Sequence, residues 1–287
     1  MFVAGLAFGS FLNVCITRIP RDESVVAPQS HCRDCGKPIR WYDNVPVLSW
    51  LVLRGRCRQC GKPILPRYPA VEVLTAALFA ACYARFGPNW FTLKFCIFSF
   101  LLVGLIFMDA ETGLLPREFT YSGIVLGLGL FRLAPVDSSG TAFLLRLFQK
   151  NLESVQWLSL LDSALGAIAG GGFFYLAWAL YYLISKRHGL GFGDVALTAM
   201  SGAFLGLKLV LLIIFCAPIL GTLYAAALLV CEAFRPPSDA KNASSGNQPF
   251  LYREIPFGVF LGTCSLAAIF AGEAAWSWYL GLFSRAG

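Results

Sequence analysis

Two aspartates beside long apolar segments, Asp109 and Asp194, are the residues of this chain best suited to do chemistry. A charged side chain at mid-bilayer costs roughly 2.5–3.5 kcal/mol on insertion scales, so acidic groups beside membrane spans usually serve a function. Two carboxyl groups that meet in a partly desolvated site share a proton. One can then activate water as a general base while the other donates a hydrogen bond to a scissile carbonyl. Two such carboxyl groups could therefore form a catalytic pair.

The residues before the second aspartate favour this interpretation. Gly191 and Gly193 precede Asp194, and glycines there let the backbone of an extended substrate approach closely. Each acid also has a plainer interpretation. Asp109 fits a simple helix-end residue, and Asp194 fits a helix N-cap, a position that aspartate prefers. Spacing alone leaves both interpretations open.

Four cysteines form a second candidate site. The segment Cys32-Arg-Asp-Cys-Gly-Lys-Pro-Ile39 recurs at 57–64 with a single substitution, and 21 residues separate the two CxxC pairs. Each pair presents two thiolates from one tight turn, and two such turns close a tetrahedron. We therefore expect a structural Zn²⁺ site with four ligands: Cys32, Cys35, Cys57 and Cys60. Two disulfides and four inert thiols are the alternatives.

The elements that must position these residues are membrane helices. The chain of 287 residues is 57% hydrophobic and only 14% charged, with a mean hydropathy of +0.66, and about 20 apolar residues cross a bilayer. We predict an all-α polytopic membrane protein with about eight transmembrane helices. They are expected at Phe2–Ile16, Val71–Phe86, Phe91–Met108, Phe119–Leu133, Leu161–Ile184, Val195–Leu207, Val210–Phe234 and Phe257–Phe283. The sixth and seventh of these helices are counted separately because we expect a turn near Lys208. A single helix of about 40 residues would be about twice as long as a bilayer is thick.

The distribution of Lys and Arg predicts the orientation. With the N-terminus outside, the inner loops carry 16 basic residues and the outer loops 7. The positive-inside rule then places the cysteine module and the ends of both aspartate-bearing spans in the cytoplasm. The net charge of +7 is mostly a signal of this topology, so we expect no nucleic-acid partner.

We expect three parts along the chain. Residues 1–16 form the first transmembrane helix and residues 17–69 a cytoplasmic, zinc-ribbon-like module. Residues 70–287 form a membrane-embedded peptidase domain. The sequence leaves the oligomeric state open.

Several segments together resemble bacterial type IV prepilin leader peptidases, in the order that this family shows. Besides the cysteine pairs, Asp109 and the Gly-Phe-Gly-Asp sequence, these segments are Gly9-Ser-Phe-Leu-Asn-Val-Cys-Ile-Thr-Arg-Ile-Pro20, Asp43-Asn-Val-Pro-Val-Leu-Ser-Trp-Leu51, Arg54-Gly-Arg56, Arg67-Tyr-Pro-Ala-Val-Glu72, Leu114-Leu-Pro116 and Ile255-Pro-Phe-Gly258. These enzymes belong to the GxGD class of intramembrane aspartic peptidases. The resemblance implies that Asp109 and Asp194 are the catalytic pair, supported by Gly191 and Gly193.

The resemblance also implies the substrates and a second activity. The substrates would be prepilins of type IV pili and pseudopilins of type II secretion, cut after a glycine on the cytoplasmic side of the bacterial inner membrane. Relatives with the four-cysteine module often N-methylate the new amino terminus with S-adenosylmethionine. By this analogy alone, Glu72, beside the module, is our candidate for the methyl-donor site, and a charge anchored at the interface is the alternative.

The chain departs from the family's pattern at two positions. Ala196 stands where the family commonly has Lys, and Arg117 where it often has an acid. We expect a modest change in the pH optimum from the missing cation.

Two competing functions stay open. One is a peptidase without the methyltransferase activity. The other is a non-enzymatic scaffold or transporter that uses the zinc module to dock partners, although a transporter would be expected to carry ionisable residues near mid-bilayer.

Overall fold

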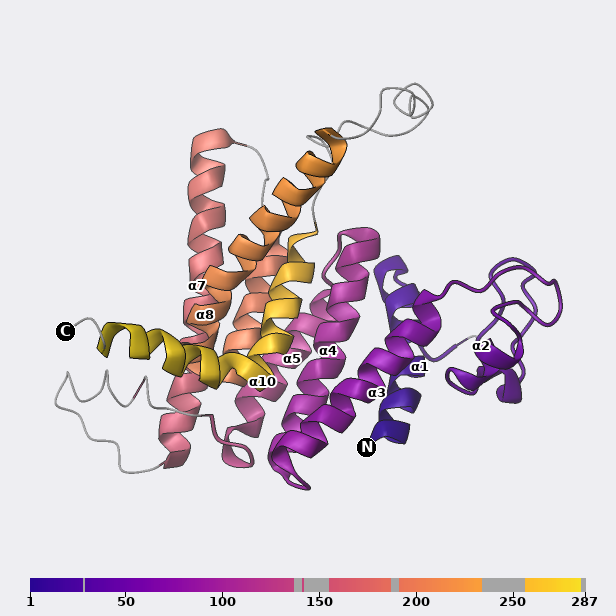
Figure 1. The fold of residues 1–287 in the computed structure, drawn as a ribbon, viewed down its shortest axis with the longest axis horizontal. Coiled ribbons are helices and arrows are strands. Elements are labelled where there is room, and N and C mark those ends of the chain that lie inside the picture. Colours follow the sequence, from indigo (N-terminus) through magenta and orange to yellow (C-terminus); the bar gives the residue numbers. More distant parts are fainter. Residues whose placement is uncertain (28, 137–140, 142–154, 187–190, 234–255, 285–287) are drawn as a thin grey trace.

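The protein is a bundle of long helices with a small cysteine-rich module on one flank (Figure 1). The computed structural model describes residues 1–27, 29–136, 141, 155–186, 191–233 and 256–284. Within these residues the chain is helical, apart from loops and two isolated β-bridges. The α-helices are α1 (Phe2–Arg18), α2 (Leu48–Val52), α3 (Arg67–Phe86), α4 (Trp90–Thr112), α5 (Arg117–Gly129), α7 (Val155–Ser185), α8 (Phe192–Ala233) and α10 (Phe257–Ser284), with short 3-10 helices at Ile19–Arg21, Trp41–Asn44 and Leu130–Arg132.

The predicted membrane architecture is confirmed in outline. In the described parts of the chain, six helices are long and apolar enough to cross a bilayer: α1, α3, α4, α7, α8 and α10. The prediction of about eight is roughly right, because α8 contains two helices and α5, with 13 residues, is the remaining short one. Helix α4 extends past the predicted end at Met108 and stops only at Gly113, whose φ of 65° ends the helix in the left-handed region.

The predicted turn near Lys208 exists, and it reverses the chain. Gly206 has φ 83° and ψ 178° inside α8. A Cβ built on Gly170 of α7 would meet both Thr198 and Val210, which flank this break. Twelve residues of straight helix would separate those two by about 18 Å, so the second half of α8 must run back beside the first.

A buried carboxylate secures this reversal. Asp162 of α7 is fully buried, and its Oδ2 accepts a hydrogen bond from the N–H of Leu207 at 3.2 Å. Leu207 begins the second half of α8, so Asp162 satisfies one of the amide groups that a helix start leaves without an intrahelical partner. Lys94 of α4 is also buried, donates to the carbonyl of Ala134 at 3.0 Å and interacts electrostatically with Asp162.

Small residues let the helices approach closely. A Cβ on Gly202 of α8 would overlap the backbone of Gly166 of α7, and a Cβ on Gly5 of α1 would lie 2.5 Å from the Cα of Ala76 in α3. The rings of Phe98 in α4 and Phe204 in α8 stack with their centroids 4.5 Å apart in the core. These contacts pack α7 against α8, α1 against α3, and α4 against the first half of α8.

Candidate active site

Asp109 lies in the last turn of α4 and is held by the start of α10. Its side chain is only 6% exposed. Its Oδ2 accepts a hydrogen bond from the N–H of Val259 at 3.0 Å, and the N–H of Gly258 donates as well. Both amides belong to the first turn of α10, where N–H groups have no intrahelical acceptor. The helix therefore fixes the carboxylate without using any side chain.

Gly258 is required by this arrangement. A Cβ at this position would lie 2.8 Å from Oδ2 of Asp109 and 3.0 Å from its Cγ. No side chain fits between α10 and this carboxylate. The sequence Pro256–Gly258, quoted above only as part of a resemblance, therefore has a physical role beside the first aspartate.

Asp194 lies in the first turn of α8 and is 7% exposed. The helix begins at Phe192, so Asp194 is inside the helix and the simple N-cap interpretation does not hold. Its backbone N–H donates to the carbonyl of Gly191 at 3.1 Å, and the N–H of Gly191 donates back to its carboxylate. The loop before α8 thus holds the second aspartate through Gly191, one of the two glycines singled out in the sequence.

The two aspartates lie close together at the same end of the bundle. Leu115, from the loop after α4, would be touched by a Cβ on Gly193 at 2.6 Å and by a Cβ on Gly258 at 3.0 Å. The same Gly258 faces Asp109, so Leu115 lies between the backbone supports of both acids. The two carboxyl groups are also close enough to interact electrostatically. The structure therefore brings together residues 85 positions apart in the sequence, as a two-carboxylate site needs.

The four cysteines also come together. Their sulfur atoms all lie within 4.8 Å of one another, and those of Cys32 and Cys60 are 3.9 Å apart. Tetrahedral zinc with bonds of about 2.3 Å places its sulfur ligands about 3.8 Å apart. The cluster could therefore bind zinc, and its ligand set and spacing fit that ion.

The repeat in the sequence produces a repeat in the structure. In each turn the first cysteine N–H bonds a lysine carbonyl, to Lys37 at 2.9 Å and to Lys62 at 2.8 Å. Gly36 and Gly61 adopt φ angles of 68° and 70°, which suit glycine. Backbone N–H groups of Cys60 and Gln59 donate to the Cys57 sulfur and lower the pKa of its thiol to about 7.

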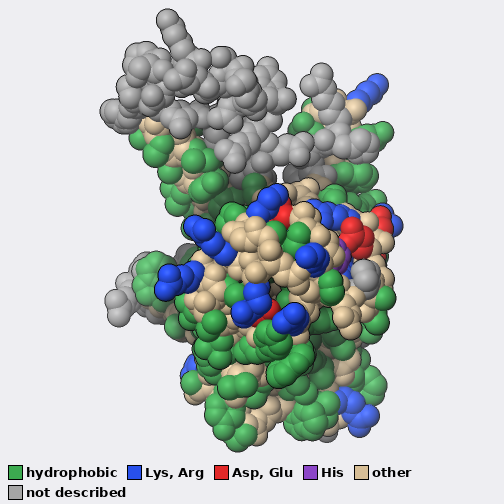
Figure 2. Space-filling model, turned by 90° about the vertical axis from the view of Figure 1, so that its right-hand side faces the viewer, with side chains coloured by type: hydrophobic (Ala, Val, Ile, Leu, Met, Phe, Trp, Pro, Cys, Tyr) green, Lys and Arg blue, Asp and Glu red, His purple; other side chains and the backbone are tan. Residues whose placement is uncertain are grey.

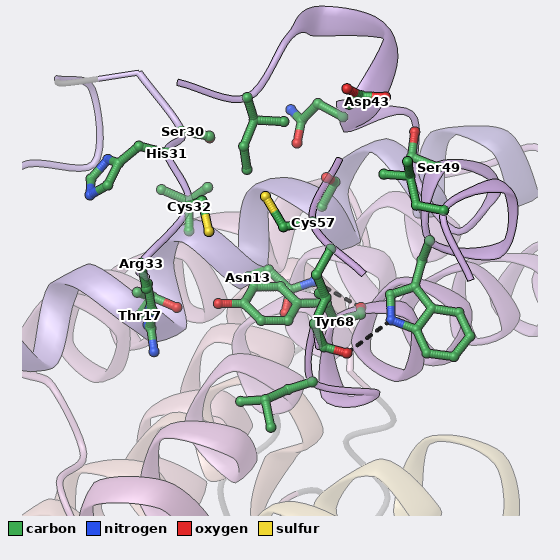
Figure 3. Close-up of a pocket in the computed structure, with 18 of the residues that line it drawn as sticks. Asn13, Thr17, Ser30, His31, Cys32, Arg33, Asp43, Ser49, Cys57 and Tyr68 are labelled. Atoms are coloured by element: carbon green, nitrogen blue, oxygen red, sulfur yellow. Dashed lines mark hydrogen bonds between the residues drawn. The ribbon is translucent and has the colours of Figure 1, made fainter. Parts of the chain in front are cut away.

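A cavity of about 380 Å³ separates the cysteine module from α1 and α3. Figure 3 shows Asn13 and Tyr68 on its membrane side and Cys32 and Cys57 on the opposite side. Glu72, also in its wall, is 8% exposed. Its Oε2 accepts the N–H of Val47 at 2.7 Å, so α3 holds the chain just before α2.

One wall group of this cavity lacks a partner. Asn13 donates through Nδ2 to the carbonyl of Tyr68 at 2.9 Å, but its buried Oδ1 has no hydrogen-bond partner among the described residues. Asn13 belongs to one of the segments quoted for the resemblance, but no pattern in the sequence assigns it a role. Its position in the cavity became visible only after α1 and α3 had been packed together.

Two family models match the chain in succession. The bacterial Peptidase A24 N-terminal domain matches residues 3–86, and the Type IV leader peptidase family matches residues 96–226. A protein of Myxococcus xanthus named prepilin leader peptidase/N-methyltransferase is 36% identical, over 87% of this chain and 69% of that protein. This chain belongs to the type IV leader peptidase family.

Other relatives carry the same name. The protein of Aeromonas hydrophila is 31% identical over 98% of this chain and 92% of its own length, and that of Neisseria gonorrhoeae is 34% identical over 80% and 82%. No solved structure matches the chain. The family and the apolar helices make this leader peptidase a multi-pass inner-membrane protein. The scaffold and transporter alternatives are not favoured.

The division at residues 16 and 69 stays a prediction. The family models instead group residues 3–86, the first two spans and the cysteine module, in one unit.

Proposed function

We propose that this protein is a membrane aspartic endopeptidase that removes the leader peptide from type IV prepilins and pseudopilins and then N-methylates the new amino terminus. The observation that carries the first activity is the meeting of Asp109 and Asp194, both buried, at one end of α4 and α8. Relatives named prepilin leader peptidase/N-methyltransferase support both activities.

Cleavage needs one ionised and one protonated carboxyl group. The ionised aspartate takes a proton from water, which attacks the scissile carbonyl carbon. The protonated aspartate donates a hydrogen bond, and then its proton, toward the carbonyl oxygen. When the tetrahedral intermediate collapses, the oxygen returns its proton to the second aspartate, and the first aspartate passes the proton it took from water to the leaving nitrogen. The C–N bond breaks and releases the leader carboxylate and a free amine. Because backbone amides hold both acids, little reorganisation accompanies these steps.

Gly193 and Gly258 let Leu115 and the Asp109 carboxylate pack directly on the backbone, whereas the nearest side-chain atom to a Cβ on Gly191 would be Oδ2 of Asp194 at 3.5 Å. An extended substrate strand can therefore approach the acids beside Gly191. The hydrophobic stem of a prepilin would lie among the helices, while its basic leader stays at the membrane surface. We place this end of the bundle, the cysteine module and the cleaved glycine bond on the cytoplasmic side because the positive-inside count supports that orientation.

The four-cysteine cluster would hold a structural Zn²⁺ that shapes the cavity beneath it. We place the S-adenosylmethionine site in that cavity. S-Adenosylmethionine supplies an electrophilic methyl group next to a cationic sulfur when bound. The carboxylate of Glu72 matches that charge, and the unpartnered Oδ1 of Asn13 offers an acceptor for an amino or hydroxyl group. Either group could also orient the substrate amine, which must lose a proton to become a nucleophile.

The test is a cleavage assay on a prepilin-like substrate in liposomes. Asp109→Asn and Asp194→Asn should each abolish cleavage while zinc content and folding stay intact. Glu118→Gln is the matched control, since Glu118 lies at the same end of the bundle but is exposed, and it should cleave normally. Normal cleavage by both Asn variants would overturn the proposed pair. Labelled S-adenosylmethionine in the same reaction tests methylation, and cleavage without label transfer would support a peptidase that lacks the second activity.

A further inference from the structure

The cysteine module exposes an unusually apolar surface for a polar segment. Trp41 is 83% exposed, and from α2 Leu48, Leu51 and Val52 are 61%, 57% and 75% exposed. Aromatic and aliphatic side chains of this size are normally buried in a water-soluble module. We call these four residues, with Tyr42, the α2 face.

The α2 face is one continuous patch. The rings of Trp41 and Tyr42 lie edge to face with centroids 5.7 Å apart. Tyr42, Leu48 and Val52 line the same shallow hollow of about 170 Å³. Leu51 follows on the five-residue helix α2.

The attachment of α2 fixes its depth. Val47, the residue before α2, donates its N–H to Glu72 at 2.7 Å. Glu72 lies five residues after Arg67, the start of α3, so the attachment point is about 7.5 Å along a helix that crosses the bilayer. The headgroup layer on each side of a bilayer is roughly 5–7 Å thick. If α3 begins at the outer edge of this layer, the attachment point lies near its inner edge. Figure 1 shows α2 in the module that projects from the flank of the bundle formed by α1 and α3.

The start of α3, where the module ends, is bonded to neighbouring helices. Arg67 donates to Thr17 of α1 at 3.2 Å and pairs with Glu111 at the end of α4. Asn13 of α1 bonds the carbonyl of Tyr68. These bonds fix the start of α3 against α1 and α4, and the bond from Val47 to Glu72 ties the module to that fixed helix.

The charges around the α2 face match an anionic surface. Residues 17–69 contain ten basic and four acidic residues. Arg40, Arg54, Arg56 and Arg58 are exposed, and Arg58 pairs with Asp43 at 2.7 Å. The guanidinium groups of Arg40 and Arg58 lie within 5.8 Å of the Tyr42 ring centre. Figure 2 looks onto this flank and shows Lys and Arg side chains over the module with hydrophobic side chains gathered below them.

We propose that the α2 face is a membrane-interface anchor that holds the cysteine module against anionic phospholipid. Trp41, Tyr42 and the α2 side chains enter the headgroup layer, and the surrounding arginines contact lipid phosphates. The anchor keeps the cavity with Glu72 at the level of the membrane surface. It is independent of the proposed function, because it depends only on the α2 face and the tethers.

The experiment uses the full zinc-loaded chain in vesicles and measures quenching of tryptophan emission by lipids brominated near the headgroup. Subtracting the emission of Trp41→Phe from that of the native chain gives the emission of Trp41 alone. We expect brominated lipid to quench most of the Trp41 emission and aqueous acrylamide to quench little of it. Trp90→Phe is the positive control, because Trp90 is exposed at the end of a transmembrane helix.

Two further comparisons separate lipid from other occupants. Leu51→Glu should reduce the quenching of Trp41 by lipid, while Val26→Glu, at an 87% exposed residue of the module outside the α2 face, should leave it unchanged; zinc content checks that both variants fold. Phosphatidylglycerol added to phosphatidylcholine vesicles should increase the quenching. Quenching of Trp41 by acrylamide and not by lipid would overturn the proposal. If Trp41 becomes protected from acrylamide only when a prepilin peptide is added, the α2 face binds a protein partner instead.

Discussion

Gly258→Ala should impair cleavage through a single added methyl group. The new Cβ would lie 2.8 Å from Oδ2 of Asp109, about 0.7 Å short of a comfortable separation of ~3.5 Å. If the carboxylate retreats by that amount, its 3.0 Å hydrogen bond from Val259 exceeds the usual limit and is lost. The substitution therefore displaces one acid of the proposed catalytic pair without removing any functional group.

The expected loss follows from this displacement. A misplacement of about 1 Å costs up to ~10²-fold in rate, so we expect a fall of about 10–100-fold in kcat/KM, or roughly 1.4–2.7 kcal/mol of transition-state stabilisation. The fall should be in kcat, with KM for the prepilin nearly unchanged, since the substrate's stem binds elsewhere.

The assay is steady-state cleavage in liposomes, with thermal unfolding measured in parallel. Gly262→Ala is the matched control: it lies one turn further along α10, and its Cβ would meet Ile106 at 2.5 Å instead of a carboxylate. It should lower the Tm but spare kcat in the folded fraction. Equal losses of kcat in both variants, or full activity in Gly258→Ala, would refute the argument.

Other outcomes are expected elsewhere in the molecule. Glu72→Gln keeps an acceptor for the N–H of Val47 but removes the negative charge proposed to match the cationic sulfur. Label transfer from S-adenosylmethionine should therefore fall at least ~10-fold, while cleavage stays within ~2-fold. Cys60→Ser should lose the metal, measured by zinc content, and with it methylation. Gly206→Ala, with φ 83° and a Cβ that would overlap Asp162, should cost about 2–5 kcal/mol, visible as a lower Tm or no folded protein. Ala196→Lys should shift the pH–rate profile of cleavage, and an unchanged profile would contradict the role given to the missing cation.

The sequence by itself determined the features that are local or periodic. The cysteine pairs predict a cluster that could bind a metal because each CxxC turn is built within a few residues, and Gly36 and Gly61 repeat one backbone conformation. Apolar length predicts membrane helices because every backbone amide in lipid must bond within its own segment. Counting those helices then placed Asp109 and Asp194 at one end of the bundle.

Only the tertiary structure decided how the acids are held. The amides of Gly258 and Val259 reach Asp109 across about 150 residues, and backbone groups carry no sequence signal. The bond from Val47 to Glu72 likewise joins a loop to a helix through packing that no local pattern encodes. The residue types determine the chemistry of the side chains. The distances that bring these side chains together into a site arise from helices packing against one another.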